Sequence, residues 1–295
     1  MEFRVLGYFL AVAREESISG AAEFLHLSQP TLSRQLKDLE DELGKQLFIR
    51  GNRKITLTEE GMLLRKRAEE ITQLVRKTED EISTFDDMIV GDVTIGAGET
   101  DSNRILAKVA KSLQQEYPLV HFHIISGDRV TITEALDHGL IDFGLVFGNI
   151  DQTKYHFMPV PYQDTWGILM RREDPLAAKE SITAEDLIDK PLIISRQAFQ
   201  NEEFKNFFGC KQEQLHIAAT YNLLFNGALM VDEGIGYAIG FDKLINVSGD
   251  SHLCFRPLKP NIKASMSIVW KKYQVFSKPA QKFLKKLKQT ISEGI

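Results

Sequence analysis

The stretch from Ser17 to Arg53 constrains the fold of this chain more than any other segment. Two helical patterns are separated there by three residues, and a short hairpin with cationic side chains follows. This order is typical of a winged helix-turn-helix, whose second helix enters the major groove of DNA. The stretch therefore predicts a DNA-binding unit, and it makes the target site and the signal the first functional questions.

Caps and apolar spacing predict three helices in this unit. The first covers about residues 3–14, Ser19 caps the second, and Ser28 caps the third, with Pro30 in its first turn. Gly44 ends the third helix, because glycine readily adopts the left-handed conformation found there. The apolar positions of the third helix predict one buried stripe: Leu32, Leu36, Leu39 and Leu43.

The opposite face of the third helix carries side chains that can meet bases and phosphates. Gln29 suits adenine and Arg34 suits guanine, while hydroxyl groups serve either base. Cations flank the Gly51-Asn52 turn of the hairpin, which suits a wing lying against phosphates. The predicted DNA-contacting residues are Ser28, Gln29, Pro30, Thr31, Ser33, Arg34, Lys37, Arg50, Arg53 and Lys54.

An ordinary three-helix core would show the same apolar stripes, and net charge does not decide between the two readings. Residues 1 to 60 hold 8 Lys and Arg against 10 Asp and Glu. A basic domain is the usual footprint of nucleic-acid binding. DNA binding therefore requires that the cations be gathered on one face.

A long run of residues in this segment matches a known family in order and spacing: Phe9, Ala21, Ala22, Leu25, Ser28, Gln29, Pro30, Ser33, Leu39, Glu40, Leu43, Gly44, Leu47, Phe48, Arg50, Leu57, Thr58 and Gly61. With these residues the segment resembles the N-terminal domain of the LysR-type transcriptional regulators. The rest of the chain fits the layout of that family as well, so the resemblance covers essentially all 295 residues. It implies a winged helix-turn-helix, a long linker helix and a two-lobed α/β effector domain of the periplasmic-binding-protein type. It further implies a transcriptional regulator, activator or repressor, whose DNA binding responds to a small-molecule co-inducer.

Composition predicts a cytoplasmic protein with sizeable cores and no membrane contact. Hydrophobic residues make up 43% of the chain and the net charge is −5. No apolar run approaches the ~20 residues that a membrane-spanning helix needs. The chain enters a helix directly from Glu2 and Arg4, so we expect no signal peptide.

A long helix is expected from about Glu59 to Ile89. Its apolar residues alternate by +4 and +3 into a seam broken only by Thr78, with charged residues on the other faces. Such a narrow seam predicts a partner helix and hence a homodimer that reads a pseudo-palindromic site; an amphipathic helix packed on its own domain is the alternative. The family resemblance adds homotetramers on DNA and possible contact with RNA polymerase. The seam comprises Leu64, Ala68, Ile71, Val75, Thr78, Ile82, Phe85 and Ile89.

After this helix, strands alternate with helices, which implies parallel βαβ units. We therefore expect a DNA-binding domain over residues 1–58, a dimerisation helix over 59–89 and an effector domain over 90–295. The resemblance implies two lobes, about 90–163 with 268–295 and about 164–267, joined by crossings near 162–165 and 263–267. Strands are expected near 90–95, 120–125, 142–147, 166–170, 192–195, 215–219, 237–239 and 265–270, and helices near 102–115, 131–138, 184–188, 202–208, 224–231 and 278–292.

Ligands of open α/β sheets bind at the carboxyl ends of strands, beside helix N-termini. Helix N-termini and Arg196 favour a carboxylate or phosphate ligand, whereas Glu99 and Asp101 oppose one and leave a zwitterion or polyol open. Solvated loop chemistry is the alternative for each of these residues. The resemblance maps the family's sensor positions onto Thr100, Ser102, Arg129, Ser195, Arg196, Thr220, Asn222 and Phe241.

Enzymatic, metal and cofactor chemistry find little support in the sequence. His121 and His123 share a strand face without a nearby third ligand, and zinc needs three or four. Cys210 and Cys254 are too far apart in sequence to match the close pair of redox-sensing relatives. We expect no catalytic site, metal or cofactor. The alternatives are a constitutive DNA-binding protein without an effector, and a ligand-processing enzyme with an appended DNA-binding domain.

Overall fold

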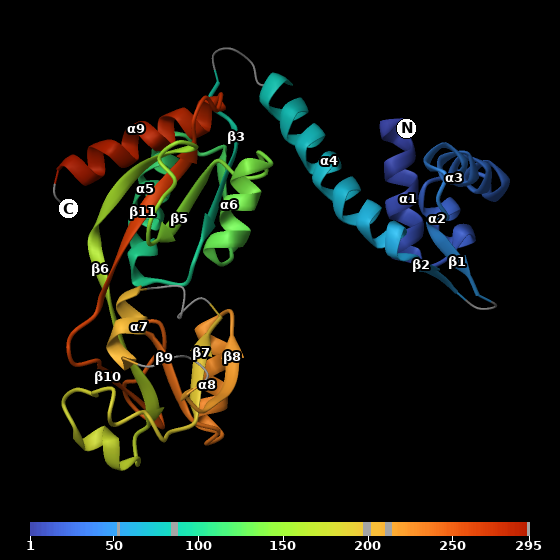
Figure 1. Ribbon diagram of the computed structural model, residues 1–295. Helices are drawn as coiled ribbons and strands as arrows, with labels where there is room; N and C mark the ends of the chain where they lie inside the picture. Colours follow the sequence, from blue (N-terminus) through green and yellow to red (C-terminus); the bar gives the residue numbers. More distant parts are fainter. Residues whose placement is uncertain (52–53, 84–87, 197–201, 210–213, 294–295) are drawn as a thin grey trace. The chain divides into compact units, whose positions relative to one another are not determined.

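The computed structural model describes residues 1–51, 54–83, 88–196, 202–209 and 214–293 (Figure 1). The chain divides into two compact units, Met1–Asp86 and Asp87–Ile295. The first is a helical unit with a two-stranded hairpin, and the second is a mixed α/β unit of two lobes. This architecture confirms the predicted fold class.

The first unit packs three helices around a small apolar core. Ala21 and Ala22 are buried, so α1 and α2 can approach closely, and the rings of Phe9 and Phe48 lie 5.1 Å apart. The predicted Ser19 cap is wrong: Ser17 caps α2 by accepting a hydrogen bond from the Gly20 N–H. The elements are α1 (Phe3–Glu15), α2 (Ile18–Phe24), α3 (Gln29–Leu43), β1 (Phe48–Arg50), β2 (Ile55–Leu57) and α4 (Glu59–Ser83).

The linker helix α4 is shorter than predicted. It ends at Ser83, and Ile89 is not helical, so at 1.5 Å per residue the helix is about 37 Å long. Phe85, a predicted member of the seam, lies outside the described residues. Thr58 caps the start of α4 by accepting a hydrogen bond from the Gly61 N–H. Gly61 is required there, because a Cβ would lie 2.2 Å from the carbonyl oxygen of Leu47.

The second unit contains most of the strands of the chain. Its elements up to the end of β6 are β3 (Gly91–Ala97), the 3₁₀ helix η1 (Asp101–Asn103), α5 (Arg104–Glu116), β4 (Val120–Ser126), α6 (Arg129–Asp137), β5 (Phe143–Phe147) and β6 (Tyr155–Arg171). The remaining elements are η2 (Pro175–Ala178), β7 (Leu192–Ser195), α7 (Glu202–Phe208), β8 (Ile217–Tyr221), α8 (Leu224–Asp232), β9 (Tyr237–Phe241), β10 (Leu253–Pro257), β11 (Lys263–Lys271) and α9 (Lys278–Ser292).

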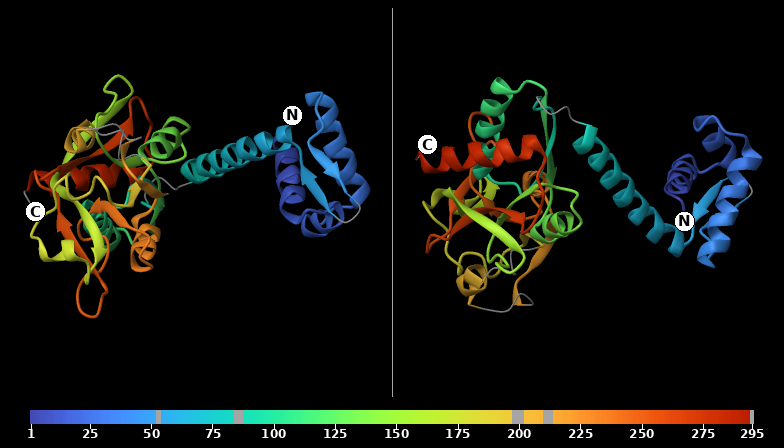
Figure 2. Two further views of the ribbon diagram at one scale, coloured as in Figure 1. Left: turned by 60° about the horizontal axis from the view of Figure 1, so that its bottom comes forward. Right: turned by 90° about the horizontal axis from the view of Figure 1, so that it is seen from above.

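Lobe I is a sheet with helices on both faces. Its strands run in the order β4-β3-β5-β11-β6, with β3 parallel to both β4 and β5. The helices α5 and α9 lie together on one side and α6 lies on the other (Figures 1 and 2). The final helix thus returns to the first lobe, as the resemblance implied.

Lobe II repeats this layering with a smaller sheet. Strand β6 pairs antiparallel with β9 and β10, while β7 lies parallel to β8 and β9. Ile193 and Val231 share one core with α8, and Ile194 and Phe204 share the other core with α7. The predicted limits of β7 and α7 are confirmed.

Two strands carry the chain from one lobe to the other. Strand β6 is 17 residues long, and β11 pairs with it from Lys271↔Tyr155 to Lys263↔Thr165. The predicted strand over 166–170 is only the last part of β6, because Pro159 and Pro161 disguise its first half in the sequence. The helix predicted over 184–188 is wrong: these residues form turns. Strand β10 was not predicted.

Within the described residues, no helix is both long enough and apolar enough to cross a membrane.

Candidate DNA-binding and effector-binding sites

The start of α3 is neutral and capped. The Ser28 hydroxyl accepts a hydrogen bond from the Thr31 N–H at 3.3 Å, Pro30 lies in the first turn, and that turn holds no acidic residue. Charge is segregated along the helix, because Arg34 and Lys37 precede a run of acidic residues at positions 38 and 40–42. The N-terminal half of α3 is therefore its cationic half.

Three leucines hold α3 in the core, and the fourth does not. Leu32, Leu36 and Leu39 are buried, as predicted, whereas Leu43 is 41% exposed because the helix has by then passed the edge of the core. The residues predicted to contact DNA are exposed, except for the half-buried Ser33, along the helix start and one face: Ser28, Gln29, Pro30, Thr31, Ser33, Arg34 and Lys37.

Arg34 extends into solvent. Its side chain is 84% exposed, and its Nε lies 3.9 Å from a carboxylate oxygen of Asp38, a long and solvated ion pair. Such pairs contribute at most about 1 kcal/mol, so Arg34 can leave Asp38 at little cost.

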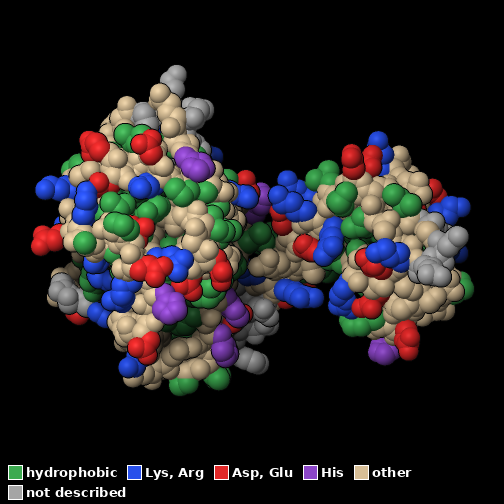
Figure 3. Space-filling view, turned by 90° about the horizontal axis from the view of Figure 1, so that it is seen from below, with side chains coloured by type: hydrophobic (Ala, Val, Ile, Leu, Met, Phe, Trp, Pro, Cys, Tyr) green, Lys and Arg blue, Asp and Glu red, His purple; other side chains and the backbone are tan. Residues whose placement is uncertain are grey.

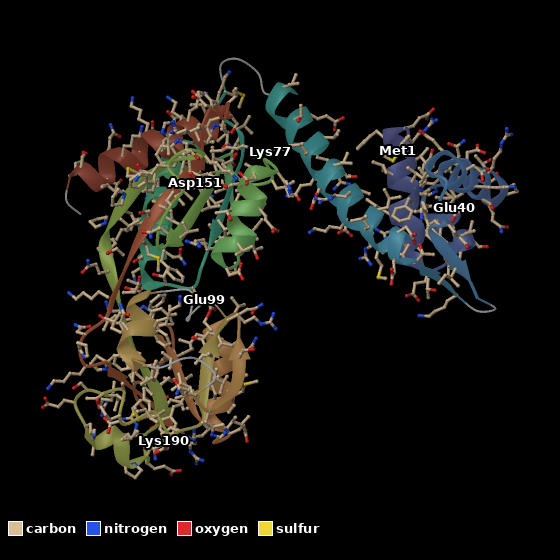
Figure 4. All side chains as sticks on the ribbon, in the orientation of Figure 1. Met1, Glu40, Lys77, Glu99, Asp151 and Lys190 are labelled. Carbon is tan, nitrogen blue, oxygen red and sulfur yellow. The ribbon has the colours of Figure 1, made fainter. Side chains whose placement is uncertain are left out.

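Glu40 joins α3 to the wing. One carboxylate oxygen accepts hydrogen bonds from the backbone N–H groups of Leu47, at 2.7 Å, and Phe48, at 3.2 Å (Figure 4). These groups lie at the start of β1, so the bonds set the position of the hairpin against the helix. This role of Glu40 was not predicted, and its only signal in the sequence is the place of Glu40 in the LysR-like run.

The predicted wing cations have different settings. Lys54 Nζ lies 3.1 Å from a carboxylate oxygen of Glu16, so it is paired rather than free. Arg53 lies outside the described residues, and of Arg50 only the backbone in β1 is described. On the face shown in Figure 3, charged side chains of both signs are interspersed over each unit.

A small cavity of about 70 Å³ lies between the lobes of the second unit. Three of the predicted effector residues line it: Ser195, Asn222 and Phe241. Glu99 lines it as well and lies at the junction of the lobes (Figure 4). The described lining residues are Gly98, Glu99, Gly127, Asp128, Leu145, Phe147, Trp166, Ser195, Tyr221, Asn222, Leu224, Gly240, Phe241, Leu244 and Met266.

Thr100 and Ser102 do not line the cavity, because both side chains bond the buried carboxylate of Asp164. The Thr100 hydroxyl donates to this carboxylate, the Ser102 hydroxyl donates at 2.8 Å, and the Asp101 N–H donates at 3.1 Å. Asp164 is 2% exposed, and its carboxylate lies at the N-terminal end of η1, where it bonds the first amide, that of Asp101.

The other three predicted effector residues are also outside the cavity lining. Arg129 donates a hydrogen bond to the Asn149 carbonyl at 3.0 Å, while Arg196 and Thr220 are exposed. Arg196, which the sequence suggested as favouring an anion, is therefore not among the described lining residues, and neither is Arg129.

Glu99 connects the lobes. Its Oε2 accepts a hydrogen bond of 2.5 Å from the Leu224 N–H, the first amide of α8 in the other lobe. An ion pair between Lys243 and Asp101, at 3.8 Å, crosses the same boundary. Burial raises the pKa of Tyr221 well above its usual value, and the nearby negative charge of Glu99 raises it further.

Aromatic rings form one wall of the cavity. The rings of Trp166 and Phe241 lie 4.3 Å apart with their planes tilted by 53°, and Phe241 meets Phe147 edge-on at 6.1 Å. The indole Nε1 of Trp166 is buried and has no hydrogen-bond partner among the described residues. Buried donors are normally paired, so this N–H has an unmet hydrogen bond among the described residues.

The comparisons with known proteins cover both units. Residues 3–62 match the bacterial regulatory helix-turn-helix protein, lysR family, and residues 87–292 match the LysR substrate binding domain. The chain belongs to the LysR family. It is thus a DNA-binding transcriptional regulator whose activity is modulated by a small-molecule effector.

Relatives and solved structures of LysR regulators match over nearly the whole chain. The regulator BsdA of Bacillus subtilis (strain 168) is 29% identical over 96% of this chain and 99% of its own. The regulator BudR of Raoultella terrigena is 25% identical over 96% and 99%. The crystal structure of full-length CbnR complexed with its target DNA has a TM-score of 0.75 at 19% identity, covering 98% and 100%.

The titratable side chains outside the cavity do not form a metal or thiol site in the described part of this LysR regulator. His123 lies 3.2 Å from Asp92, but no group of three potential metal ligands occurs among the described residues. Burial raises the pKa of the Cys254 thiol, which disfavours the reactive thiolate. Cys210 lies outside the described residues.

Proposed function

We propose that this LysR regulator reads a pseudo-palindromic promoter site as a homodimer, and that a co-inducer bound between its lobes changes that binding. The main support for the proposal is the start of α3. Its first turn is capped and holds no acidic residue, and the adjoining exposed polar face lies opposite the buried leucines. A helix N-terminus of this kind attracts phosphates, and the adjoining side chains can reach base edges.

The roles within the DNA site follow from side-chain chemistry. Gln29, Ser33 and Arg34 would read bases, with Arg34 directed at guanine and Gln29 at adenine. Ser28, Pro30, Thr31 and Lys37 would lie against the backbone of the same groove. The wing cations Arg50, Arg53 and Lys54 would hold phosphates, with Lys54 exchanging Glu16 for a phosphate.

Exposed apolar side chains support self-association. Ile71, Leu74 and Ile82 on α4 are all exposed, Ile82 at 79%. A partner α4 would bury them and bring two recognition helices onto one site. Ile124 and Ile125 on the edge strand β4 are also exposed, which offers a further surface for joining dimers into a tetramer.

The effector would act through the relative position of the lobes. A ligand shifts such an equilibrium only if it binds one arrangement more tightly than the other. The two crossing strands β6 and β11 let one lobe turn relative to the other, and the change would alter subunit spacing, DNA bending and access of RNA polymerase.

We further propose that the chain works in the cytoplasm, where bacterial DNA lies, and that it acts by binding rather than catalysis, without a metal or other cofactor. The relatives named above are transcriptional regulators, which supports this view.

Genome-wide sequencing of the fragments bound by purified protein tests the proposal, with the region upstream of its own gene as a check. A few sharp sites with two-fold symmetry are expected. Diffuse binding without a motif would contradict it and favour a constitutive architectural protein instead.

Replacing Arg34 tests the base-reading role. Arg34→Ala should reduce discrimination at one base position by about 1–3 kcal/mol and leave binding to random DNA almost unchanged. Lys54→Ala should weaken binding to all sequences and lower the salt dependence. Arg65→Ala, which removes an exposed charge from α4, is the control. Equal loss on specific and random DNA for Arg34→Ala would contradict the role.

A further inference from the structure

We infer that the cavity between the lobes takes a small organic cation, an amine with an apolar body, and that Glu99 selects its positive charge. The inference rests on the proposed binding of an effector in this cavity and names its chemical class. It departs from the anionic ligand that helix N-termini in such a cleft would ordinarily favour.

The chain's own carboxylates occupy the helix N-termini around the cavity. Glu99 accepts from the first amide of α8 at 2.5 Å, and Asp128 accepts from the Thr131 N–H at the start of α6 at 2.8 Å. Asp164 does the same at η1, which leads into α5. An anionic ligand would have to displace one of these carboxylates, and like charge opposes its approach.

The charge of the lining points the same way. Glu99 and Asp128 are its charged members, and Lys, Arg and His are absent from its described residues. The nearest candidates are engaged elsewhere: Arg129 on the Asn149 carbonyl, and Lys243 between Asp101 and Asp242. Among the described lining residues, a cation therefore meets negative charge and no positively charged side chain.

The remaining wall suits a cation with an apolar body. Phe147, Trp166, Tyr221 and Phe241 present aromatic surface, and a cation close to an aromatic face is attracted by its quadrupole. Leucines and Met266 complete the apolar lining. At about 70 Å³, the cavity selects a small ligand.

Two groups are positioned to orient such a ligand. Glu99 uses Oε2 for the Leu224 amide, while Oε1 makes no hydrogen bond to the described residues and can accept from an ammonium group. The indole N–H of Trp166, a lining residue, has no partner among the described residues, so a ligand oxygen that reaches it would accept its hydrogen bond. An amine that also carries a hydroxyl or carbonyl oxygen would satisfy both groups.

Two matched probe series test the charge preference on the full chain. The first is benzylamine, benzyl alcohol and benzoate; the second is n-butylamine, n-butanol and butyrate. Binding is followed by calorimetric titration and by the fluorescence of Trp166, with Trp166→Phe as the check that the signal comes from the cavity. In at least one series the amine should bind about tenfold more tightly than the alcohol, with the carboxylate weakest.

Glu99→Gln separates charge from structure. Glutamine keeps an oxygen for the Leu224 amide but removes the negative charge, so the amine should lose about tenfold in affinity while the alcohol changes little. Glu134→Gln, on an exposed residue of α6, is the control and should change neither. If Glu99→Gln fails to fold, Phe241→Leu serves instead, and the amine should lose more affinity than the alcohol.

Three results would overturn the assignment: the carboxylates bind most tightly, Glu99→Gln leaves amine binding unchanged, or neither series shows a preference for its amine. Absence of binding by all six probes counts as the last of these. DNA binding to the upstream region is measured in parallel. If the parent chain binds the upstream DNA specifically but a carboxylate is the ligand that binds the cavity, only the proposed ligand class is rejected. If the parent chain shows no specific DNA binding, the proposed function itself is rejected.

Discussion

The recognition helix α3 and the helices around the effector cavity begin in different electrostatic settings. Helix α3 starts with the neutral Ser28 cap and has no acid in its first turn. Helices α8 and α6 and the 3₁₀ helix η1 start against Glu99, Asp128 and Asp164. A helix N-terminus carries about half a positive charge, so the first is left open to an external anion and the others are neutralised from within.

This difference shows how one physical property serves two binding tasks in one chain. The DNA-binding unit has to bind phosphate although its net charge is not basic, and it keeps its acidic residues away from the start of α3. The effector unit pairs the same kind of helix-terminal amides with its own carboxylates, and one of these bonds, from the Leu224 N–H to Glu99, joins the two lobes.

Asp164→Ala should have the largest effect, because it removes one of the carboxylates that neutralise helix N-termini within the effector unit. It leaves the Thr100 and Ser102 hydroxyls and the Asp101 N–H without their acceptor, and the expected loss of unfolding free energy is about 3 kcal/mol. Urea unfolding followed by tryptophan fluorescence measures it in the right unit, since both tryptophans, Trp166 and Trp270, lie in the effector unit.

The control for this variant is Asp189→Ala, which removes an exposed carboxylate from the same unit. It should change the free energy of unfolding by less than about 0.5 kcal/mol. A loss equally small for Asp164→Ala would mean that the three donors find water or other partners, and that Asp164 does not hold η1.

The DNA-binding unit also has a carboxylate that binds backbone amides, but Glu40 does so at the wing and not at a helix start. Glu40→Ala tests whether this carboxylate positions the wing. Removing it leaves the Leu47 and Phe48 N–H groups unpaired at a cost of about 2 kcal/mol. Hydrogen exchange at these two amides should accelerate, and affinity should fall on all DNA sequences because the wing loses its position.

The neighbouring Asp41→Ala is the matched control, since Asp41 is exposed on the same helix. It should leave amide exchange at Leu47 and Phe48 unchanged. Unchanged exchange in Glu40→Ala as well would show that packing, such as the contact between Phe9 and Phe48, positions the wing without Glu40.

Elements that are fixed by local sequence signals were predicted more accurately than elements that depend on contacts between residues far apart in the sequence. Helices α3 and α9 begin at Ser-x-Pro caps, after Ser28 and Ser277. The Ser28 cap was read from the sequence, and the predicted limits of both helices lie close to those observed. Strand β6 was truncated in the prediction because its first half contains prolines and is stabilised by pairing with β11, about a hundred residues later. No local pattern encodes that register.

The effector site shows the same division. The loops after strands were predicted to hold it, and three residues of these loops, Ser195, Asn222 and Phe241, line the cavity. The roles of Thr100 and Ser102 stay predictions, because their hydroxyls bond Asp164, more than 60 residues away in sequence. The acidity of Glu99 was visible in the sequence, but its bond to Leu224, 125 residues later, was not.

Ser28→Asp places a carboxylate at the start of α3, as at the helix starts of the effector unit, and should have the smallest effect on folding. Aspartate is as good an N-cap as serine, so unfolding free energy should stay within about 0.5 kcal/mol. DNA affinity should fall about tenfold, or about 1.4 kcal/mol, on specific and random DNA alike, because a carboxylate now stands where a phosphate would bind.

Ser28→Asn, a neutral cap of the same shape, should bind DNA almost as the parent chain does. Titration of a labelled operator at several salt concentrations distinguishes the two variants. Equal affinity for the aspartate and asparagine variants would mean that α3 reaches DNA through its side chains alone, and that its open N-terminus plays no part in binding.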